Sequence, residues 1–195
     1  VLTISGTGDM PDFVSADNQP WYSFNTKICS AIIAEGVTSV GDYAFSDCAN
    51  MSNVIIADSV TSIGDYAFYM CELTDISISQ YVTSIGKYAL SFCTSLKEIT
   101  VDTNNPCYSS ENNVLFNKDR SVLIRYAANK TDSSYTIPEE VTSIGEYAFF
   151  GCSNLIKIDI PDGVASIGEY AFSYCTYLSD IIIPDSVISI GDSAF

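Results

Sequence analysis

The nine residues "VTSIGDYAF", Val60–Phe68, recur through the chain in nearly identical form. The copies begin at Val37, Val60, Val82, Val141, Val164 and Val187. Most copies start 22 or 23 residues after the previous one, and the single long gap of 59 residues equals one unit of 22 plus an extended unit of 37. A repeat of this length indicates a solenoid, because each unit forms one coil that can bury its apolar face only when neighbouring coils stack on it.

A complete unit joins a strand-like segment to this motif. The unit that begins at Leu155 reads L-x-x-I-x-I-P-D-G-V-x-S-I-G-E-Y-A-F-x-x-C. In its first part, Ile158 and Ile160 alternate with Lys157 and Asp159, which predicts a strand with one buried and one exposed face. Stacking of such strands in register predicts a parallel sheet.

The nine-residue motif is expected to form the return path of each coil as a short helical or irregular turn. Its glycine, Gly64 in the second copy, permits either a positive φ angle or a close approach of two backbones. The Asp or Glu that follows is expected where a short helical turn begins, and the Ala-Phe pair then enters the core. Equivalent positions predict a single hydrophobic spine of Phe45, Phe68, Leu90, Phe149, Phe172 and Phe195.

The unit resembles the BspA-type leucine-rich repeat family, whose pattern is close to "LxxIxIPxxVTSIGxxAFxxC", and the match covers residues 37–195. The N-terminal "LTISGTGDMPDF" and "PWYSF" look like the segment that precedes such arrays. The resemblance implies an α/β leucine-rich repeat solenoid, right-handed, with short parallel strands on one face and short helical or irregular turns on the other. We expect residues 1–36 to form an N-terminal capping segment, and residues 37–195 to form an array truncated at the C-terminus.

Residues 104–140 are expected to form the extended unit of this array. Within it, "NVLFNKDRSVLIRY" predicts a β-hairpin that turns at Asn117 to Arg120, and Tyr135 and Ile137 then recover the ordinary strand position. We expect the array to continue unbroken through this unit. In the capping segment, Trp21, Tyr22 and Phe24 are expected to cover the apolar end of the first coil, with ligand stacking as the alternative.

Five of the seven cysteines recur at one phase of the unit and predict a ladder of buried thiols. They are Cys48, Cys71, Cys93, Cys152 and Cys175. One cysteine per coil does not supply the convergent ligands of a metal site. Disulfides between adjacent coils satisfy the Cα distance, but parallel side chains and the odd total disfavour them. A column of tyrosines at 43, 66, 88, 147 and 170 is interpreted as packing, with a ligand-binding strip as the alternative.

The charge balance and composition exclude several functional classes. Eight Lys and Arg stand against 24 Asp and Glu, which argues against nucleic acid and anionic membranes as partners. The chain has no histidine, the usual general base for serine or cysteine nucleophiles. Repeated carboxylates meet the spacing for glycoside hydrolysis but lack a distinguishing pocket, and the G-G-x-G-x-D calcium pattern is absent. We expect no catalytic residue, no cofactor and no metal.

Function is therefore expected to reside in a surface, and solenoids characteristically offer an extended concave one. The outward positions of the predicted strands supply the candidate partner-binding residues Asn53, Ile55, Asp75, Ser77, Glu98, Thr100, Lys157, Asp159, Asp180 and Ile182. The resemblance implies a non-catalytic protein-binding module of a bacterial cell-surface or secreted protein, which adheres to host matrix or other cell-surface proteins. The alternative is a structural spacer or stalk that carries another domain of a longer protein.

Overall fold

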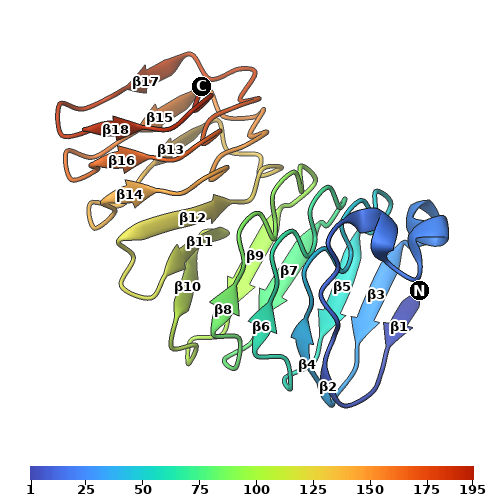
Figure 1. The fold of residues 1–195 in the computed structure, drawn as a ribbon. Helices are drawn as coiled ribbons and strands as arrows, with labels where there is room; N and C mark the ends of the chain where they lie inside the picture. The colour runs from blue at the N-terminus through green and yellow to red at the C-terminus, as the bar shows by residue number, and fades with distance from the viewer.

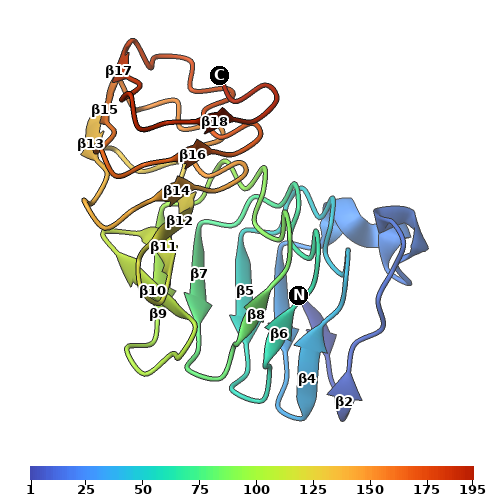
Figure 2. The ribbon, with the colours of Figure 1, turned by 60° about the vertical axis from the view of Figure 1, so that its left-hand side comes forward.

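The computed structural model describes residues 1–195, which form a parallel-strand β-solenoid of about seven turns (Figure 1). A regular coil contributes two short strands, and Figure 2 shows that these lie in two separate layers. The L-x-x-I-x-I segments form the first column: β1 (Leu2–Ile4), β3 (Ser30–Ile33), β5 (Asn53–Ile56), β7 (Asp75–Ile78), β9 (Glu98–Val101), β13 (Ser134–Thr136), β15 (Lys157–Asp159) and β17 (Asp180–Ile182). The V-x-S-I segments form the second column: β4 (Val37–Val40), β6 (Ser62–Ile63), β8 (Ser84–Ile85), β14 (Ser143–Ile144), β16 (Ser166–Ile167) and β18 (Ser189–Ile190), preceded by β2 (Gly8–Asp9).

Most neighbouring strands within each column pair in parallel and in register, so equivalent residues of successive units lie side by side. The strands β5 and β7 are in contact but are not paired. Ile76 is the partner of Ile99 in the first column, and Ile63 is the partner of Ile85 in the second. The predicted stacking of repeats is thereby confirmed.

In the capping segment, β1 and β3 also join this sheet ahead of β5. The Trp21 ring stacks on Phe45 as expected, with 5.8 Å between ring centroids. Tyr22 and Phe24 are exposed, so the prediction that they also cover the first coil is wrong.

The expected α/β class is corrected to a parallel β-solenoid, because the return path contains strands and turns in place of α-helices. The helical segments are the 3₁₀ helices η1 (Ala16–Asn18) and η2 (Tyr22–Lys27). In each regular copy the tyrosine of the motif has a positive φ, 55° at both Tyr43 and Tyr66. Since a left-handed residue interrupts the right-handed helical path, the D-Y-A-F segment forms consecutive turns.

The motif glycines are required by the close approach of neighbouring coils. A Cβ on Gly64 would lie 2.6 Å from the backbone nitrogen of Asp42 and 2.7 Å from the carbonyl carbon of Gly41, both in the preceding coil. Of the two explanations that the sequence left open, close backbone approach is the one that the structure supports, and the positive φ occurs two residues later at the tyrosine.

The extended unit forms an antiparallel meander of β10 (Tyr108–Glu111), β11 (Val114–Asn117) and β12 (Val122–Tyr126). The predicted hairpin between β11 and β12 is confirmed. A second hairpin joins β10 to β11 through Asn112 and Asn113, whose φ angles of 50° and 61° are those of a type I′ turn. The last strand of the meander, β12, pairs in parallel with β14.

The prediction of an unbroken array with one spine is wrong at this unit. Neither column pairs across it, since β9 does not pair with β13 and β8 does not pair with β14. The strands of the two halves point in different directions (Figures 1 and 2). The core accordingly divides in two, with Phe68 in one cluster and Phe172 in the other. One aromatic file runs through Trp21, Phe45 and Phe68, and a second runs through Tyr126, Phe149, Phe172 and Phe195.

Candidate functional site

The outward side chains of the first column form a surface that we call the strand face. All ten residues that the sequence predicted for partner binding lie on it, eight of them exposed and two, Asp75 and Lys157, half-buried. Parallel pairing places Asp75 beside Glu98 and Ser77 beside Thr100. The hydroxyls of Ser77 and Thr100 lie 3.0 Å apart.

The break at the extended unit divides the strand face into two patches. The N-terminal patch lies on β5, β7 and β9 and contains Asn53, Ile55, Asp75, Ser77, Glu98 and Thr100. The C-terminal patch lies on β15 and β17 and contains Lys157, Asp159, Asp180 and Ile182. Four neighbours in register with these residues, Ser30 and Ile32 on β3 and Ser134 and Thr136 on β13, were not predicted. The "SAII" of β3 follows no leucine and lies in the expected capping segment. The β13 strand was predicted through Tyr135 and Ile137, but its outward positions were not included in the predicted surface.

Each patch combines one exposed isoleucine with carboxylates. Ile55 is 56% exposed and Ile182 is 77% exposed. On the C-terminal patch, the Lys157 Nζ lies 3.1 Å from Asp159 and 4.0 Å from Asp180, and its hydrogen bond to Asp159 raises the pKa of the ammonium group. Each patch presents an exposed isoleucine on the same face as two carboxylates, which suits a partner whose contact surface has both apolar and basic side chains.

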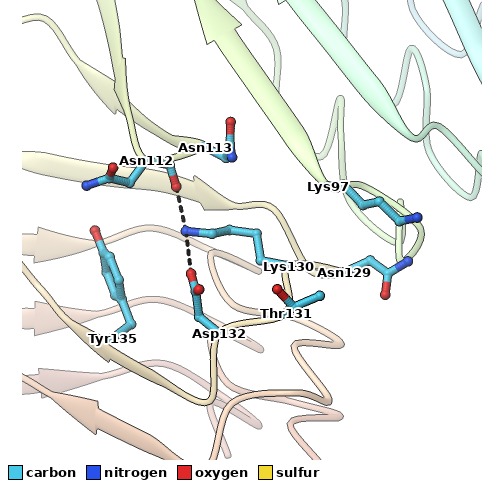
Figure 3. A pocket seen from close by; sticks show the side chains of 8 residues that line it. All are labelled: Lys97, Asn112, Asn113, Asn129, Lys130, Thr131, Asp132 and Tyr135. Carbon is cyan, nitrogen blue, oxygen red and sulfur yellow. Dashed lines mark hydrogen bonds and ion pairs between the residues drawn. The ribbon is translucent and has the colours of Figure 1, made fainter.

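A polar notch of about 460 Å³ lies where the extended unit meets the two halves (Figure 3). It is lined by Lys97, Asn112, Asn113, Asn129, Lys130, Thr131, Asp132 and Tyr135. The Lys130 Nζ donates to the Asn112 carbonyl at 2.5 Å, forms an ion pair with Asp132 at 2.9 Å and packs over the Tyr126 ring at 4.6 Å. These contacts, shown partly in Figure 3, fix the loop after β12 against the β10–β11 turn.

The tyrosine column continues across the break between the two halves. Neighbouring ring centroids lie 4.6 Å apart at Tyr43–Tyr66, 4.8 Å at Tyr66–Tyr88, 5.2 Å at Tyr88–Tyr147 and 4.9 Å at Tyr147–Tyr170. Desolvation is the largest cause that raises the pKa of Tyr88 and of Tyr147 to about 12. The column therefore packs as the sequence predicted, and it joins coils whose strands do not pair.

The cysteine ladder is present as predicted. Cys48, Cys71, Cys93 and Cys152 are buried and Cys175 is half-buried. The thiols of Cys71 and Cys93 donate to carbonyls of the preceding coil, each at 3.1 Å. Burial raises the pKa of Cys48 to about 12 and that of Cys93 to about 11, so these thiols stay protonated at neutral pH. No group of three or more acidic or cysteine side chains is arranged to hold a metal ion, and no helix is long and apolar enough to cross a membrane.

Comparison with known proteins identifies relatives over most of the chain. The model of the BspA type leucine-rich repeat region matches in six copies, over residues 20–124 and 124–195. A leucine-rich repeat protein from Eubacterium ventriosum is 33% identical with a TM-score of 0.71, over 97% of this chain and 63% of that one. A leucine-rich cell surface protein from Faecalibacterium prausnitzii is 32% identical with a TM-score of 0.75, over 89% of this chain and 52% of that one.

The pneumococcal vaccine antigen PcpA is 26% identical with a TM-score of 0.79, over 83% of this chain and 46% of that one. This chain thus spans between 46% and 63% of the length of these three proteins. A search of curated proteins found no match.

Proposed function

The chain belongs to the BspA-type leucine-rich repeat family, and from this premise we propose that it is a non-catalytic module that binds a protein partner through the strand face. The repeat fold supports a protein-interaction role, because stacked coils multiply one short strand into an extended surface. The observation that carries the proposal is the exposure of the strand face in register, with an isoleucine among carboxylates in both patches.

The partner is proposed to be a cell-surface or matrix protein, met by this chain outside a bacterial cell. The support comes from the relatives, since one is described as a cell surface protein and another as a vaccine antigen. A net charge of −16 favours a partner whose contact surface is basic, because opposite charges speed association and disfavour wrong partners. A spacer that only holds another domain is the alternative function, and it requires no binding by the strand face.

The test reverses charges on the strand face and compares the result with an equal change elsewhere. The variant carries Glu98→Lys, Asp159→Lys and Asp180→Lys. The matched control carries Asp17→Lys, Glu72→Lys and Asp192→Lys, which change the net charge by the same amount on exposed residues that line no groove with the strand face. Both proteins and the unchanged chain are coated on beads and applied to cultured epithelial cells and to immobilised fibronectin and collagen.

We expect the unchanged chain to bind at least one of these surfaces and the strand-face variant to bind about tenfold more weakly, a loss of about 1.4 kcal/mol. The control variant should bind within about twofold of the unchanged chain, because exposed charges outside a contact change affinity little. Equal losses in the two variants would reject the strand face as the site. Absence of binding by the unchanged chain would support the spacer function.

A further inference from the structure

Most side chains that line the polar notch have free polar groups. Of the eight lining residues, only Lys130 and Asp132 use their side chains in a hydrogen bond or ion pair within the chain. The other six are Lys97, Asn112, Asn113, Asn129, Thr131 and Tyr135. The buried side-chain nitrogen and oxygen atoms that lack a partner belong to Gln19, Arg120 and Arg125. The free groups of the notch are therefore open to solvent, and a ligand can reach them.

Three separate segments hold these side chains on a common backbone frame. The segments are the one that precedes β9, the β10–β11 turn and the loop after β12. Backbone hydrogen bonds join them, because Asn129 N donates to Leu96 O at 2.7 Å and Ala127 N donates to Asn113 O at 3.2 Å. The frame of the notch is therefore formed before a ligand arrives, which lowers the entropic cost of binding.

The free groups lie on both sides of the lysine–aspartate ion pair at the centre of the notch (Figure 3). Asn112 and Tyr135 lie on one side of this pair, and Lys97 and Asn129 lie on the other. A ligand that contacts both groups must extend across the ion pair. The volume of about 460 Å³ is within the range of about 300–1,000 Å³ that is typical of small-molecule sites.

The lining suits a ligand that is rich in hydroxyl groups. Only one of the eight lining residues, Tyr135, is hydrophobic, which disfavours an apolar ligand. An asparagine amide both donates and accepts hydrogen bonds. The three asparagines of the notch therefore match sugar hydroxyls, which also donate and accept.

The notch has one cation that no carboxylate neutralises. The Lys130 Nζ lies 2.9 Å from Asp132, so this pair has no net charge. Lys97 is exposed and belongs to none of the four ion pairs in the structure. A single free ammonium group suits one carboxylate, whereas a ligand with several phosphates requires more cations.

We propose that the notch binds an oligosaccharide that carries a carboxylate, of the sialic acid or uronic acid class. The asparagine amides bind the sugar hydroxyls, and the Lys97 ammonium group binds the carboxylate. No lining residue of the notch belongs to the strand face. The proposal is therefore independent of the protein partner proposed above, and the two can fail separately.

Isothermal titration calorimetry of the intact chain compares sialyllactose with lactose, and trigalacturonic acid with its methyl ester. We expect at least one acidic probe to bind saturably, with a Kd of about 0.1–1 mM. Its neutral counterpart should bind about tenfold more weakly, because it lacks the charge-assisted contact to Lys97. No saturable binding of either acidic probe, or equal binding of the neutral counterpart, would overturn the proposal.

Two variants with matched controls locate the site. Lys97→Met should weaken binding of the acidic probe about tenfold, whereas Lys87→Met, which removes an exposed cation outside the notch, should change it less than about twofold. Asn129→Ala should weaken binding about threefold to tenfold, and its control is Asn53→Ala, an exposed asparagine of the strand face. Thermal unfolding confirms that each variant is folded. Equal losses in a variant and its control would reject the notch as the site.

Two measurements on the unchanged chain keep the proposal testable if a variant does not fold. In heteronuclear NMR spectra, the side-chain amide signals of Asn112, Asn113 and Asn129 should shift during titration with the acidic probe, and shifts confined to residues outside the notch would reject the site. A glutamate tripeptide, which has carboxylates but no sugar hydroxyls, should bind more weakly than the acidic sugar. Equal or tighter binding of the peptide would overturn the carbohydrate assignment.

Discussion

Replacement of Gly168 by alanine tests whether the motif glycine is required by the packing of coils. A Cβ at this position would lie 2.5 Å from the backbone nitrogen of Glu146 and 2.7 Å from the carbonyl carbon of Gly145. Ordinary van der Waals contact begins at 3.4 Å, so the coils must separate by about 0.9 Å. That movement stretches the hydrogen bond from Gly168 N to Ile144 O, which is 2.8 Å long.

The expected loss combines overpacking, about 1–3 kcal/mol, with weakened hydrogen bonds of about 0.5–1.5 kcal/mol each. We therefore expect Gly168→Ala to lower the free energy of unfolding by about 2–4 kcal/mol. Gly145→Ala should cost less, because its nearest atom, the Leu123 carbonyl oxygen of the extended unit, lies 3.0 Å away. Gly163→Ala is the control, since its Cβ would meet no atom closer than 3.4 Å and its φ is not positive.

Urea unfolding followed by far-UV circular dichroism measures all three variants under one set of conditions. Gly163→Ala should be neutral or more stable by about 0.4–1 kcal/mol, because alanine restricts the unfolded chain. If Gly168→Ala and Gly163→Ala differ by less than about 0.5 kcal/mol, close approach of the coils is not the reason for the glycine.

Two other predictions follow from the cores. The Phe149 ring is fully buried between Tyr126 and Phe172, so Phe149→Ala should lower the free energy of unfolding by about 3–5 kcal/mol in urea. The Phe195 ring is 57% exposed, so Phe195→Ala should cost less than half as much. Equal losses would contradict this difference in burial. The folded state raises the pKa of Cys48 to about 12 and that of Cys93 to about 11. A raised pKa contributes stability that is fully present below the pKa of the unfolded chain and is lost as the pH rises through the pKa of the folded chain. The free energy of unfolding should therefore fall as the pH rises from about 8.5 toward 12. Serine at both positions should make the decline between pH 9 and 11 shallower in thermal unfolding, while the buried thiols of Cys71 and Cys152, whose pKa values are also raised, keep part of it.

Repetition made the stacking of coils predictable from the sequence. Identical letters at one phase can contact one another only if the units lie in register, and the thiol ladder and the stacking of aromatic rings within each half follow from that. The division of the aromatic rings into two files does not follow from it. The return path was not predictable in the same way. Two residues of strand, such as Ser62 and Ile63, are too short for alternation to be distinguished from a turn, and the positive φ of tyrosine has no signature in its side chain.

The other wrong predictions, of an unbroken array and a single spine, concern the extended unit. The Asn112–Asn113 pair between two short runs is a signal for a tight hairpin, and it would have revealed that a meander, rather than a longer coil, separates the halves. The ten predicted residues of the strand face did follow from alternation, because five of them lie between two inward positions of a strand and the other five directly precede the first inward position. The notch did not, since it depends on how the meander packs against coils distant in sequence.

The meander also sets how this molecule can change over generations. Recombination between nearly identical units adds or deletes whole coils. Each such event lengthens or shortens one half of the solenoid by one coil and leaves the angle between the two halves unchanged. Substitutions, insertions or deletions in the extended unit, residues 104–140, change the angle between the two halves instead. The length of each half and the angle between the halves are therefore inherited separately. Variants with equal numbers of coils can still differ in the direction of their two halves.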